Sequence, residues 1–300
     1  MFERRLYHHI DWALLLAVAA LCLLGITQIY AVLLGVLALV VCLSIDYRSL
    51  ADKSHFIYIA VIALLACVLF FGAVRGGSRR WIDLDVFNIQ PSEFAKAALA
   101  LVLAKFFGES RRGTVTRVDL VVAGALTAIP LVLIAQQPDL GTALLVTAAG
   151  FFVLFLAGLS WKIIAGIGVA GTASLPLVWS VLHDYQRQRI LTLLDPTQDP
   201  LGAGYHTIQS TIAVGAGGLI GKGWLKGTQA HLDFIPERTT DFIFAVYSEE
   251  FGLFGNLVLL LVFLLAIARG MVITANAPTL FARLLAGAVT LTFFTYAFTH

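Results

Sequence analysis

The sequence has few charged residues: Asp, Glu, Lys and Arg make up only 13% of its 300 positions. A soluble domain carries roughly 25%. Hydrophobic residues make up 59% of the chain, and a water-facing globule of this size cannot hide so much apolar surface. The shortage of charge excludes a soluble enzyme and a disordered chain, and it predicts a protein whose solvent is lipid.

Cysteine is also scarce, and Cys22, Cys42 and Cys67 all lie inside apolar runs. A free cysteine in such a run behaves as a small hydrophobic residue. The spacing gives no C-x-x-C metal pair and no disulfide framework, which excludes a disulfide-stapled secreted domain. The net charge of +2 is too small to indicate nucleic acid as a partner.

Long apolar runs divide the chain into about nine candidate membrane spans. The uncharged run from Trp12 to Ile45 fits two helices with a turn near residues 28–31. The hydrophobic run continues without interruption, so we expect a retained first span rather than a cleaved signal peptide. The other runs cover residues 56–74, 94–107, 118–135, 140–158, 162–182, 241–268 and 281–299. This pattern predicts an all-α polytopic integral membrane protein with one membrane domain over residues 1–300.

The unequal distribution of Lys and Arg predicts the orientation, because basic residues in short loops stay in the cytoplasm. One side collects Arg4, Arg5, Arg48, Lys53, Lys105, Arg111, Arg112, Arg117, Lys162, Arg269 and Arg283. The short loops of the other side hold only Arg75, Arg79 and Arg80. We therefore expect a cytoplasmic amino terminus, with the loop 75–93 and the large loop 183–240 on the extracytoplasmic side.

Two patterns in the large loop each have two interpretations. Its eight glycines between Gly202 and Gly227 suggest a phosphate loop, but Gly221-Lys222 is followed by Gly223 instead of Ser or Thr. Tight turns and close backbone packing explain these glycines better than a nucleotide cradle. His231 with Asp233 could bind a divalent cation, although solvated loop polarity is the simpler interpretation.

Ionisable residues inside or beside a span are costly, so each is a candidate functional residue. Glu93 and Lys96 are three apart and share one helical face. They either seal a packed helix as an ion pair or line a polar cavity that opens outward. Asp139 follows Pro138 between two spans, where it is either a helix cap or a site residue.

Asp241 opens a long apolar helix directly after the large loop. It could serve only as a cap. However, Ser248 and Glu249 lie on roughly the same face of that helix. Several acidic groups on one buried face indicate a polar site between helices, where desolvation favours a proton-accepting carboxylate.

These segments resemble the signature regions of the SEDS family (shape, elongation, division and sporulation), and the resemblance covers nearly the whole chain. The matching segments are Arg80 to Leu84 with Ile89 to Lys96, Gln137 to Thr142, and the series from Asp195 to Phe244 that includes Gly217-Gly218-Leu219 and Gly221-Lys222-Gly223. Glu237-Arg238 fits the rod-elongation branch better than the division branch.

The resemblance implies a multi-pass protein of the bacterial cytoplasmic membrane that polymerises lipid II into peptidoglycan glycan strands during cell elongation. It also implies a class B penicillin-binding protein as transpeptidase partner, beside other membrane proteins of the elongation machinery. The family's essential acid corresponds to Asp241 here, and family knowledge implicates the positions of Trp81, Glu93 and Lys96.

These implications give a mechanistic hypothesis in which Asp241 is the general base that takes a proton from the attacking sugar hydroxyl. Lys96 and Arg80 would compensate the charge of the lipid pyrophosphate, with Lys96 held by Glu93. Trp81 would stack on a sugar or lie at the membrane interface. The remaining candidates for substrate binding are Gln90, Asp139, Gln209, Glu237 and Thr240. A divalent cation, Mg²⁺ or Mn²⁺, could also bind the pyrophosphate, but no ligand set in the sequence requires one.

The chain departs from the family pattern in two ways. Thr239 stands where the family commonly has His, and the chain stops at His300, inside the ninth of the family's ten spans. We therefore expect a truncated sequence. A transporter or flippase for lipid-linked precursors, or a scaffold that only recruits an enzyme, is the alternative function. The candidate charges lie near the predicted outer ends of the spans, which favours the enzyme.

Overall fold

The computed structural model describes residues 29–75, 78–83, 88–110, 115–182, 184–198, 204–228 and 242–299. The chain divides into two compact units, which are described separately. Unit 1 comprises Met1–Leu33, Lys162–Ala266 and His300, and unit 2 comprises Leu34–Trp161 and Ile267–Thr299.

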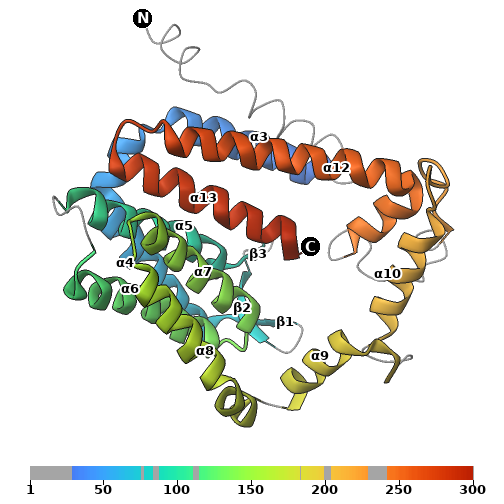
Figure 1. Ribbon diagram of the computed structural model, residues 1–300, viewed down its shortest axis with the longest axis horizontal. Coiled ribbons are helices and arrows are strands. Elements are labelled where there is room, and N and C mark those ends of the chain that lie inside the picture. The colour runs from blue at the N-terminus through green and yellow to red at the C-terminus, as the bar shows by residue number, and fades with distance from the viewer. Residues whose placement is uncertain are drawn as a thin grey trace, which may run out of the picture. The chain divides into compact units, whose positions relative to one another are not determined.

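Unit 2 is a bundle of apolar helices (Figure 1). They are most of α3 (Ile29–Ser44), then α4 (Tyr47–Phe71), α5 (Pro91–Glu109), α6 (Arg117–Ala135), α7 (Leu140–Leu156), the end of α12 (Ile243–Ala275) and α13 (Leu280–Thr299). Helix α5 lies at the centre and packs against α4, α6, α7 and α13. Its Leu99, Leu103 and Ala104 are fully buried, so this helix forms much of the core.

Local sequence signals explain where these helices begin. Asp46 caps α4, because its side chain accepts a hydrogen bond from the Arg48 backbone N–H at 2.9 Å. Thr116 and Asp119 form a reciprocal capping box at the start of α6. Pro91 occupies the first turn of α5, where its missing N–H costs nothing.

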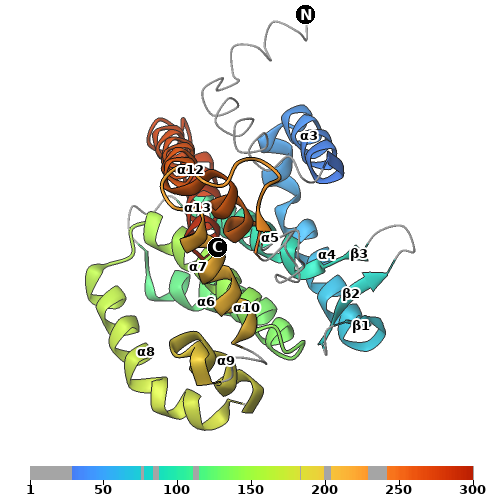
Figure 2. The same cartoon turned by 90° about the vertical axis from the view of Figure 1, so that its right-hand side faces the viewer.

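A small sheet connects α4 to α5 within the predominantly helical fold that the sequence predicts. Strands β1 (Ala73–Arg75), β2 (Ser78–Asp83) and β3 (Asn88–Ile89) are antiparallel in the order β1-β2-β3. Ala73 pairs with Trp81 and Ile82 with Ile89. The strands are too short for their alternation to stand out beside long apolar runs. Figure 2 shows the sheet beside α4 and α5.

Unit 1 contains α8 (Trp161–Val181), α9 (Asp184–Leu194), the short 3-10 helix η1 (Pro196–Gln198), α10 (Tyr205–Ala216) and the first part of α12. Three of these elements fall within the predicted 183–240 loop. That segment is therefore partly helical, whereas the sequence indicated only its polarity and its glycines.

Helix α12 is broken at Gly252, whose φ of +63° and ψ of −161° lie outside the helical region. The glycine-rich segment 217–228 packs against this break. Its Lys222 and Gly223 N–H groups donate to the Glu249 and Glu250 carbonyls at 3.0 and 2.9 Å. Its Gly218 carbonyl accepts from the Leu253 N–H at 2.9 Å. The segment thus satisfies backbone groups that a broken apolar helix leaves open, which is the structural role expected of these glycines.

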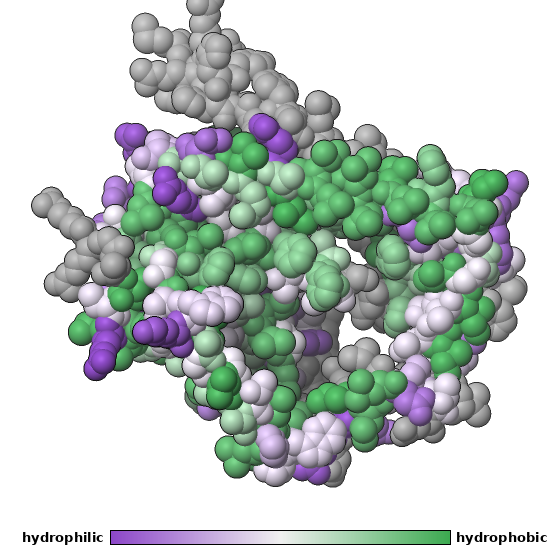
Figure 3. Space-filling view, in the orientation of Figure 1, coloured by the Kyte–Doolittle hydropathy of each residue, from purple (hydrophilic) through white to green (hydrophobic). Residues whose placement is uncertain are grey.

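The helices fit a multi-pass membrane protein. Within the described ranges, five are long and apolar enough to cross a bilayer: α4, α6, α8, α12 and α13. The shorter apolar helix α7 and the charged helix α5 match two more predicted spans, and α3 matches a third. The first predicted span lies outside the described residues. The exposed surface of α12 is largely apolar (Figure 3), with Leu257 and Leu261 more than half exposed, as expected of a lipid-facing helix.

Candidate functional site

The Asp139 carboxylate joins three elements of unit 2. It caps α7 by accepting hydrogen bonds from the Thr142 backbone N–H at 3.1 Å and from the Thr142 hydroxyl at 2.9 Å. The Arg80 guanidinium on β2 donates to Asp139 Oδ2 at 3.2 Å, and the Gln90 amide before α5 donates to the same oxygen at 3.2 Å. Asp139 therefore caps α7, as the cap interpretation predicts, and its other contacts link this cap to β2 and to the residue before α5.

Burial makes this network energetically significant. Only 8% of the Asp139 side chain is exposed, against 33% for Arg80. A buried carboxylate needs a counter-charge and hydrogen bonds to offset its loss of hydration, and Asp139 has both. The Arg80 Nε–H is buried and has no hydrogen-bond partner among the described residues.

A second network surrounds Lys96, which lies in the second turn of α5. Its ammonium donates to Glu93 Oε2 at 2.7 Å, which confirms the expected contact between these two side chains. It also contacts the Tyr296 hydroxyl on α13 and lies 4.6 Å from the centre of the Tyr296 ring. The Tyr296 hydroxyl donates to Glu93 Oε2 at 3.2 Å, which closes a three-membered cluster. Lys96 is buried, whereas half of the Glu93 side chain is exposed.

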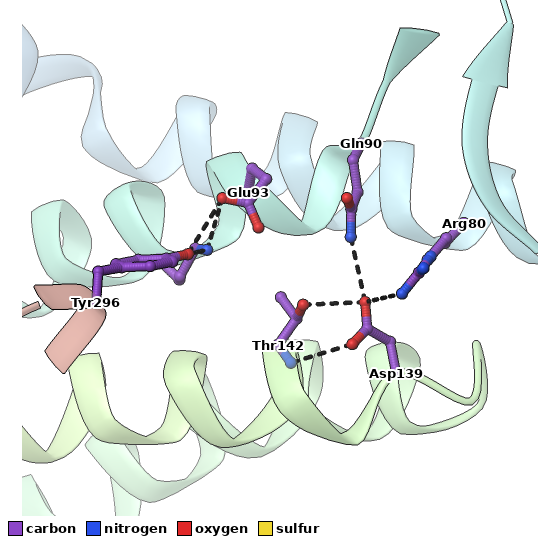
Figure 4. A network of polar contacts seen from close by, with 7 residues as sticks. Arg80, Gln90, Glu93, Asp139, Thr142 and Tyr296 are labelled. Carbon is purple, nitrogen blue, oxygen red and sulfur yellow. Dashed lines mark hydrogen bonds and ion pairs between the residues drawn. The ribbon is translucent and has the colours of Figure 1, made fainter. Parts of the chain in front are cut away.

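The two networks lie along one side of α5, facing α7 and α13 (Figure 4). Arg80 and Lys96 contribute two positive charges, and Asp139 and Glu93 contribute two negative ones. Each charge is paired, so the region is polar without net charge. Such an arrangement can bind a charged ligand group by exchanging an internal partner for the ligand.

Two residues of these networks were not predicted as site residues. Tyr296 lies some two hundred positions after Lys96, and only the packing of α13 against α5 brings them together. The one sequence signal was the polarity of the last helix, which carries Thr290, Thr295 and Thr299 beside Tyr296. Thr142 stands three residues after Asp139, the spacing typical of a cap partner.

The structure does not gather all the predicted site residues into this region. Trp81 lies on β2, half-buried, and its side chain makes no hydrogen bond or ring contact with a described residue. Gln209 lies half-buried on α10 in unit 1. Asp241, Thr240 and Glu237 lie outside the described residues, as does Thr239.

The polar face predicted after Asp241 contains a second ion pair, in unit 1. Glu249 is completely buried and accepts from Lys222 Nζ at 2.7 Å. It also accepts from the Thr228 N–H at 2.9 Å and hydroxyl at 3.0 Å. Ser248 is buried beside it and bonds Asn256 across the break of α12. These contacts bind the glycine-rich segment to α12.

The described side chains do not form a metal site. No three His, Cys, Asp or Glu residues within the described ranges lie close enough together to hold an ion. His231 and Asp233, the pair considered for a cation, lie outside them.

Comparison with known proteins extends over almost the whole chain. A sequence model of the cell cycle proteins FtsW, RodA and SpoVE matches residues 16–300. The peptidoglycan glycosyltransferase MrdB of Escherichia coli K12 is 48% identical over 274 residues, which cover 91% of this chain and 74% of MrdB.

Two solved structures share the fold. One, described as structural coordination of polymerization and crosslinking by a peptidoglycan synthase complex, superposes with a TM-score of 0.80 at 32% identity. That match covers 96% of this chain and 84% of the other. The crystal structure of the rod shape determining protein RodA of Thermus thermophilus gives a TM-score of 0.68 at 28% identity, covering 97% and 83%.

Proposed function

Because the chain belongs to the FtsW/RodA/SpoVE family, the SEDS family that its motifs resemble, we propose that it polymerises lipid II into glycan strands during cell elongation. It is a multi-pass protein of the bacterial inner membrane and a peptidoglycan glycosyltransferase. The observation that carries the activity is the 48% identity, over 91% of the chain, to a protein of that name.

The partner is a class B penicillin-binding protein that cross-links the new strands. The similar solved complex couples polymerization with crosslinking, so a polymerase of this fold works beside a transpeptidase. Other membrane proteins of the elongation machinery complete the assembly.

The networks of unit 2 bind the charged end of the lipid substrate. The Arg80 side chain is one-third exposed beside its contact with Asp139, and a guanidinium suits the oxygens of a pyrophosphate. Lys96 supplies a second cation, which Glu93 and Tyr296 hold in place. Gln90 and Thr142 orient Asp139 through hydrogen bonds. Trp81, Gln209, Glu237 and Thr240 complete the proposed substrate contacts.

Asp241 acts as the general base. Its carboxylate takes the proton from the sugar hydroxyl of one lipid II as that oxygen attacks the anomeric carbon of the other. The new glycosidic C–O bond forms while the bond between the anomeric carbon and the lipid pyrophosphate breaks. The cations of unit 2 stabilise the negative charge that builds up on the departing pyrophosphate.

The transporter alternative has less support. None of the relatives reported above is named as a transporter. The networks of Asp139 and Lys96 also lie near one set of helix ends, at the start of α7 and of α5. A transport path would need polar groups through both halves of the membrane.

The test is polymerisation of purified lipid II by the protein with its transpeptidase partner, read as glycan chain length on a gel. Asp241→Asn keeps the size and the capping ability of the side chain but cannot accept a proton. We expect long glycan from the wild type and at least about a hundredfold less from Asp241→Asn, the usual scale for loss of a general base.

Asp233→Asn is the matched control, because it removes an acid eight residues away in the same segment, and it should polymerise normally. Equal glycan from wild type and Asp241→Asn would remove Asp241 from the mechanism. Absence of glycan from the wild type, together with movement of lipid II across vesicles, would favour the transporter.

A further inference from the structure

A cavity of about 240 Å³ lies in unit 2 at the ends of α4 and α5 remote from the sheet. It is bounded by the first turns of α4, the last turn of α5 and the start of α13. Helix α4 leads away from this cavity to β1, and α5 returns to it from β3. None of its lining residues belongs to the networks of Asp139 or Lys96, so the proposed polymerase mechanism does not use it.

Each of the two helices contributes one cation and one anion to the cavity. Arg48 and Asp52 are four residues apart on one face of α4, yet neither side chain forms an ion pair with a described residue. On α5, Lys105 lies 3.8 Å from Glu109 and donates to the Asp52 backbone carbonyl at 3.4 Å. The cavity thus carries two charges of each sign. The Arg48 guanidinium interacts with the Tyr47 side chain and with the charge of Asp46, and no ion pair joins it to Asp52.

The wall of the cavity is aromatic and continues into exposed apolar surface. The Tyr47 and Phe281 rings stack with centroids 6.4 Å apart, and Gly108 allows Phe281 to approach α5 closely. Phe56 follows Asp52 by one turn on the same face of α4 and is 65% exposed. Ile59, one turn further, is 61% exposed. The charged lining of the cavity is therefore continuous with a stripe of exposed apolar residues along the membrane-spanning helix α4.

We propose that this cavity binds a phospholipid whose headgroup carries both a phosphate and a primary ammonium, as in phosphatidylethanolamine. The phosphate contacts Arg48 and Lys105, and the guanidinium offers it a bidentate fork. The ammonium donates to the Asp52 and Glu109 carboxylates. The acyl chains lie along Phe56 and the apolar residues that follow it.

The charges and the size of the cavity favour this headgroup over others. An anionic headgroup without an amine would bring its phosphate beside two carboxylates that it cannot satisfy. A choline headgroup has no N–H to donate to them. The volume is below the roughly 300–1,000 Å³ of clefts that enclose whole drug-sized ligands, which suits a headgroup whose tails remain in the bilayer.

The test measures lipid binding to the purified full chain in detergent by native mass spectrometry. The probes are phosphatidylethanolamine, phosphatidylcholine and phosphatidylglycerol with identical acyl chains, and soluble phosphoethanolamine. We expect phosphatidylethanolamine to bind the wild type about tenfold more tightly than the other two lipids, the scale of one charge-assisted hydrogen bond. Phosphoethanolamine alone should bind more weakly than the lipid, because it lacks the contact with the apolar stripe.

Arg48→Gln and Asp52→Asn should each weaken phosphatidylethanolamine binding about tenfold. Lys53→Gln is the matched control: it removes an exposed charge of the same helix that does not line the cavity, and it should change nothing. Asp52→Asn should also reduce the preference over phosphatidylcholine, which a general loss of folding would not do.

Three outcomes would overturn the proposal. Equal or tighter binding of phosphatidylglycerol would show that the two carboxylates do not select for an amine. Equal binding of phosphatidylcholine would show that the N–H donors of the ammonium do not contribute to affinity. Phosphoethanolamine binding as tightly as the lipid would assign the cavity to a soluble ligand. These comparisons use the wild type alone, so they hold even if a variant fails to fold.

Discussion

Some side chains at the helix ends of unit 2 both stabilise a helix and hold residues of the proposed site. Asp139 is the clearest example. Its carboxylate caps α7 and also holds Arg80 and Gln90. Asparagine keeps a capping oxygen but loses the charge, whereas alanine loses both. The two substitutions therefore separate the two duties.

We predict that Asp139→Ala lowers stability by about 1 kcal/mol more than Asp139→Asn, the typical contribution of an N-cap. Both substitutions should reduce lipid II polymerisation, because each leaves Arg80 without its counter-charge. Thermal unfolding in detergent measures the first effect, and glycan formation measures the second. Equal unfolding temperatures for the two variants would contradict the capping role.

Tyr296 offers a second prediction. Tyr296→Phe keeps the ring over Lys96 but removes the hydroxyl that contacts both Lys96 and Glu93. Because Lys96 retains Glu93, we expect a fewfold to tenfold loss of polymerisation, the range of one hydrogen bond. Thr299→Val is the control, since among the described residues the Thr299 hydroxyl bonds only carbonyls of its own helix. A full loss of activity with normal folding would give the hydroxyl a larger role.

The sequence predicted contacts between residues that are close together in the chain, but not contacts between residues that are far apart in it. Glu93 and Lys96 are three apart on a helix, so their contact followed from periodicity alone. The bond from Arg80 to Asp139 spans 59 positions and depends on how the sheet meets α7. The contact of Lys96 with Tyr296 spans 200 positions, and no local pattern carries that information.

Among the elements, α12 depends on an ion pair that one substitution can disrupt. Glu249 is fully buried and bound by Lys222 and Thr228. Glu249→Leu should destabilise the protein, because it removes the acceptor that Lys222 and Thr228 share. The loss should stay below about 3–5 kcal/mol, the cost of leaving a fully buried charge alone, since Lys222 is 31% exposed and water can solvate it.

Lys222→Met removes a counter-charge from the buried Glu249 carboxylate, so it should also destabilise. The double variant Lys222→Met with Glu249→Leu should be more stable than either single variant, because no buried charge remains. Thermal unfolding of the three variants checks this order. Additive losses in the double variant would mean that the two side chains act independently.

Replacing each of two glycines by alanine should change the stability of the protein in opposite directions. Gly252 adopts a φ of +63°, and a Cβ there would strike the backbone of residues 217–221. Gly252→Ala should therefore lower the unfolding temperature, since the strain of this region is about 1–3 kcal/mol and the clash adds to it.

Gly168 on α8 is the control, because a Cβ there meets nothing within 4 Å. Gly168→Ala should raise stability by up to about 1 kcal/mol, as alanine favours a helix. A stabilised Gly252→Ala variant would contradict the described geometry of the break.

The long elements were predictable because apolar runs of this length favour a membrane-spanning helix. The helix boundaries were less predictable. Helix α4 begins at Tyr47, nine residues before the apolar run from which it was predicted. The run does not include the first turns of the helix because Arg48, Asp52 and Lys53 make them polar. The strands and the helices α9 and α10 were missed because their signals are short. Their positions depend on the helices that they connect.

At the scale of the whole molecule, the orientation in the membrane remains a prediction from the Lys and Arg distribution. In a variant with Cys22, Cys42 and Cys67 replaced by serine, we would introduce Asn88→Cys on β3 or Ser110→Cys at the end of α5. A membrane-impermeant maleimide should label Asn88→Cys in intact spheroplasts, and Ser110→Cys only after permeabilisation. The reverse labelling would invert the topology, and the variant without cysteines gives the background.

The ion pair between Arg80 and Asp139 also makes the carboxylate an internal competitor for any anion that approaches the guanidinium. A tethered partner acts at an effective concentration of about millimolar or above. An anion must therefore compete with Asp139 for the guanidinium, and a pyrophosphate, which presents several oxygens and more charge than chloride, competes more effectively. Under the proposed function, Asp139 in this way favours the pyrophosphate over a monovalent anion at Arg80.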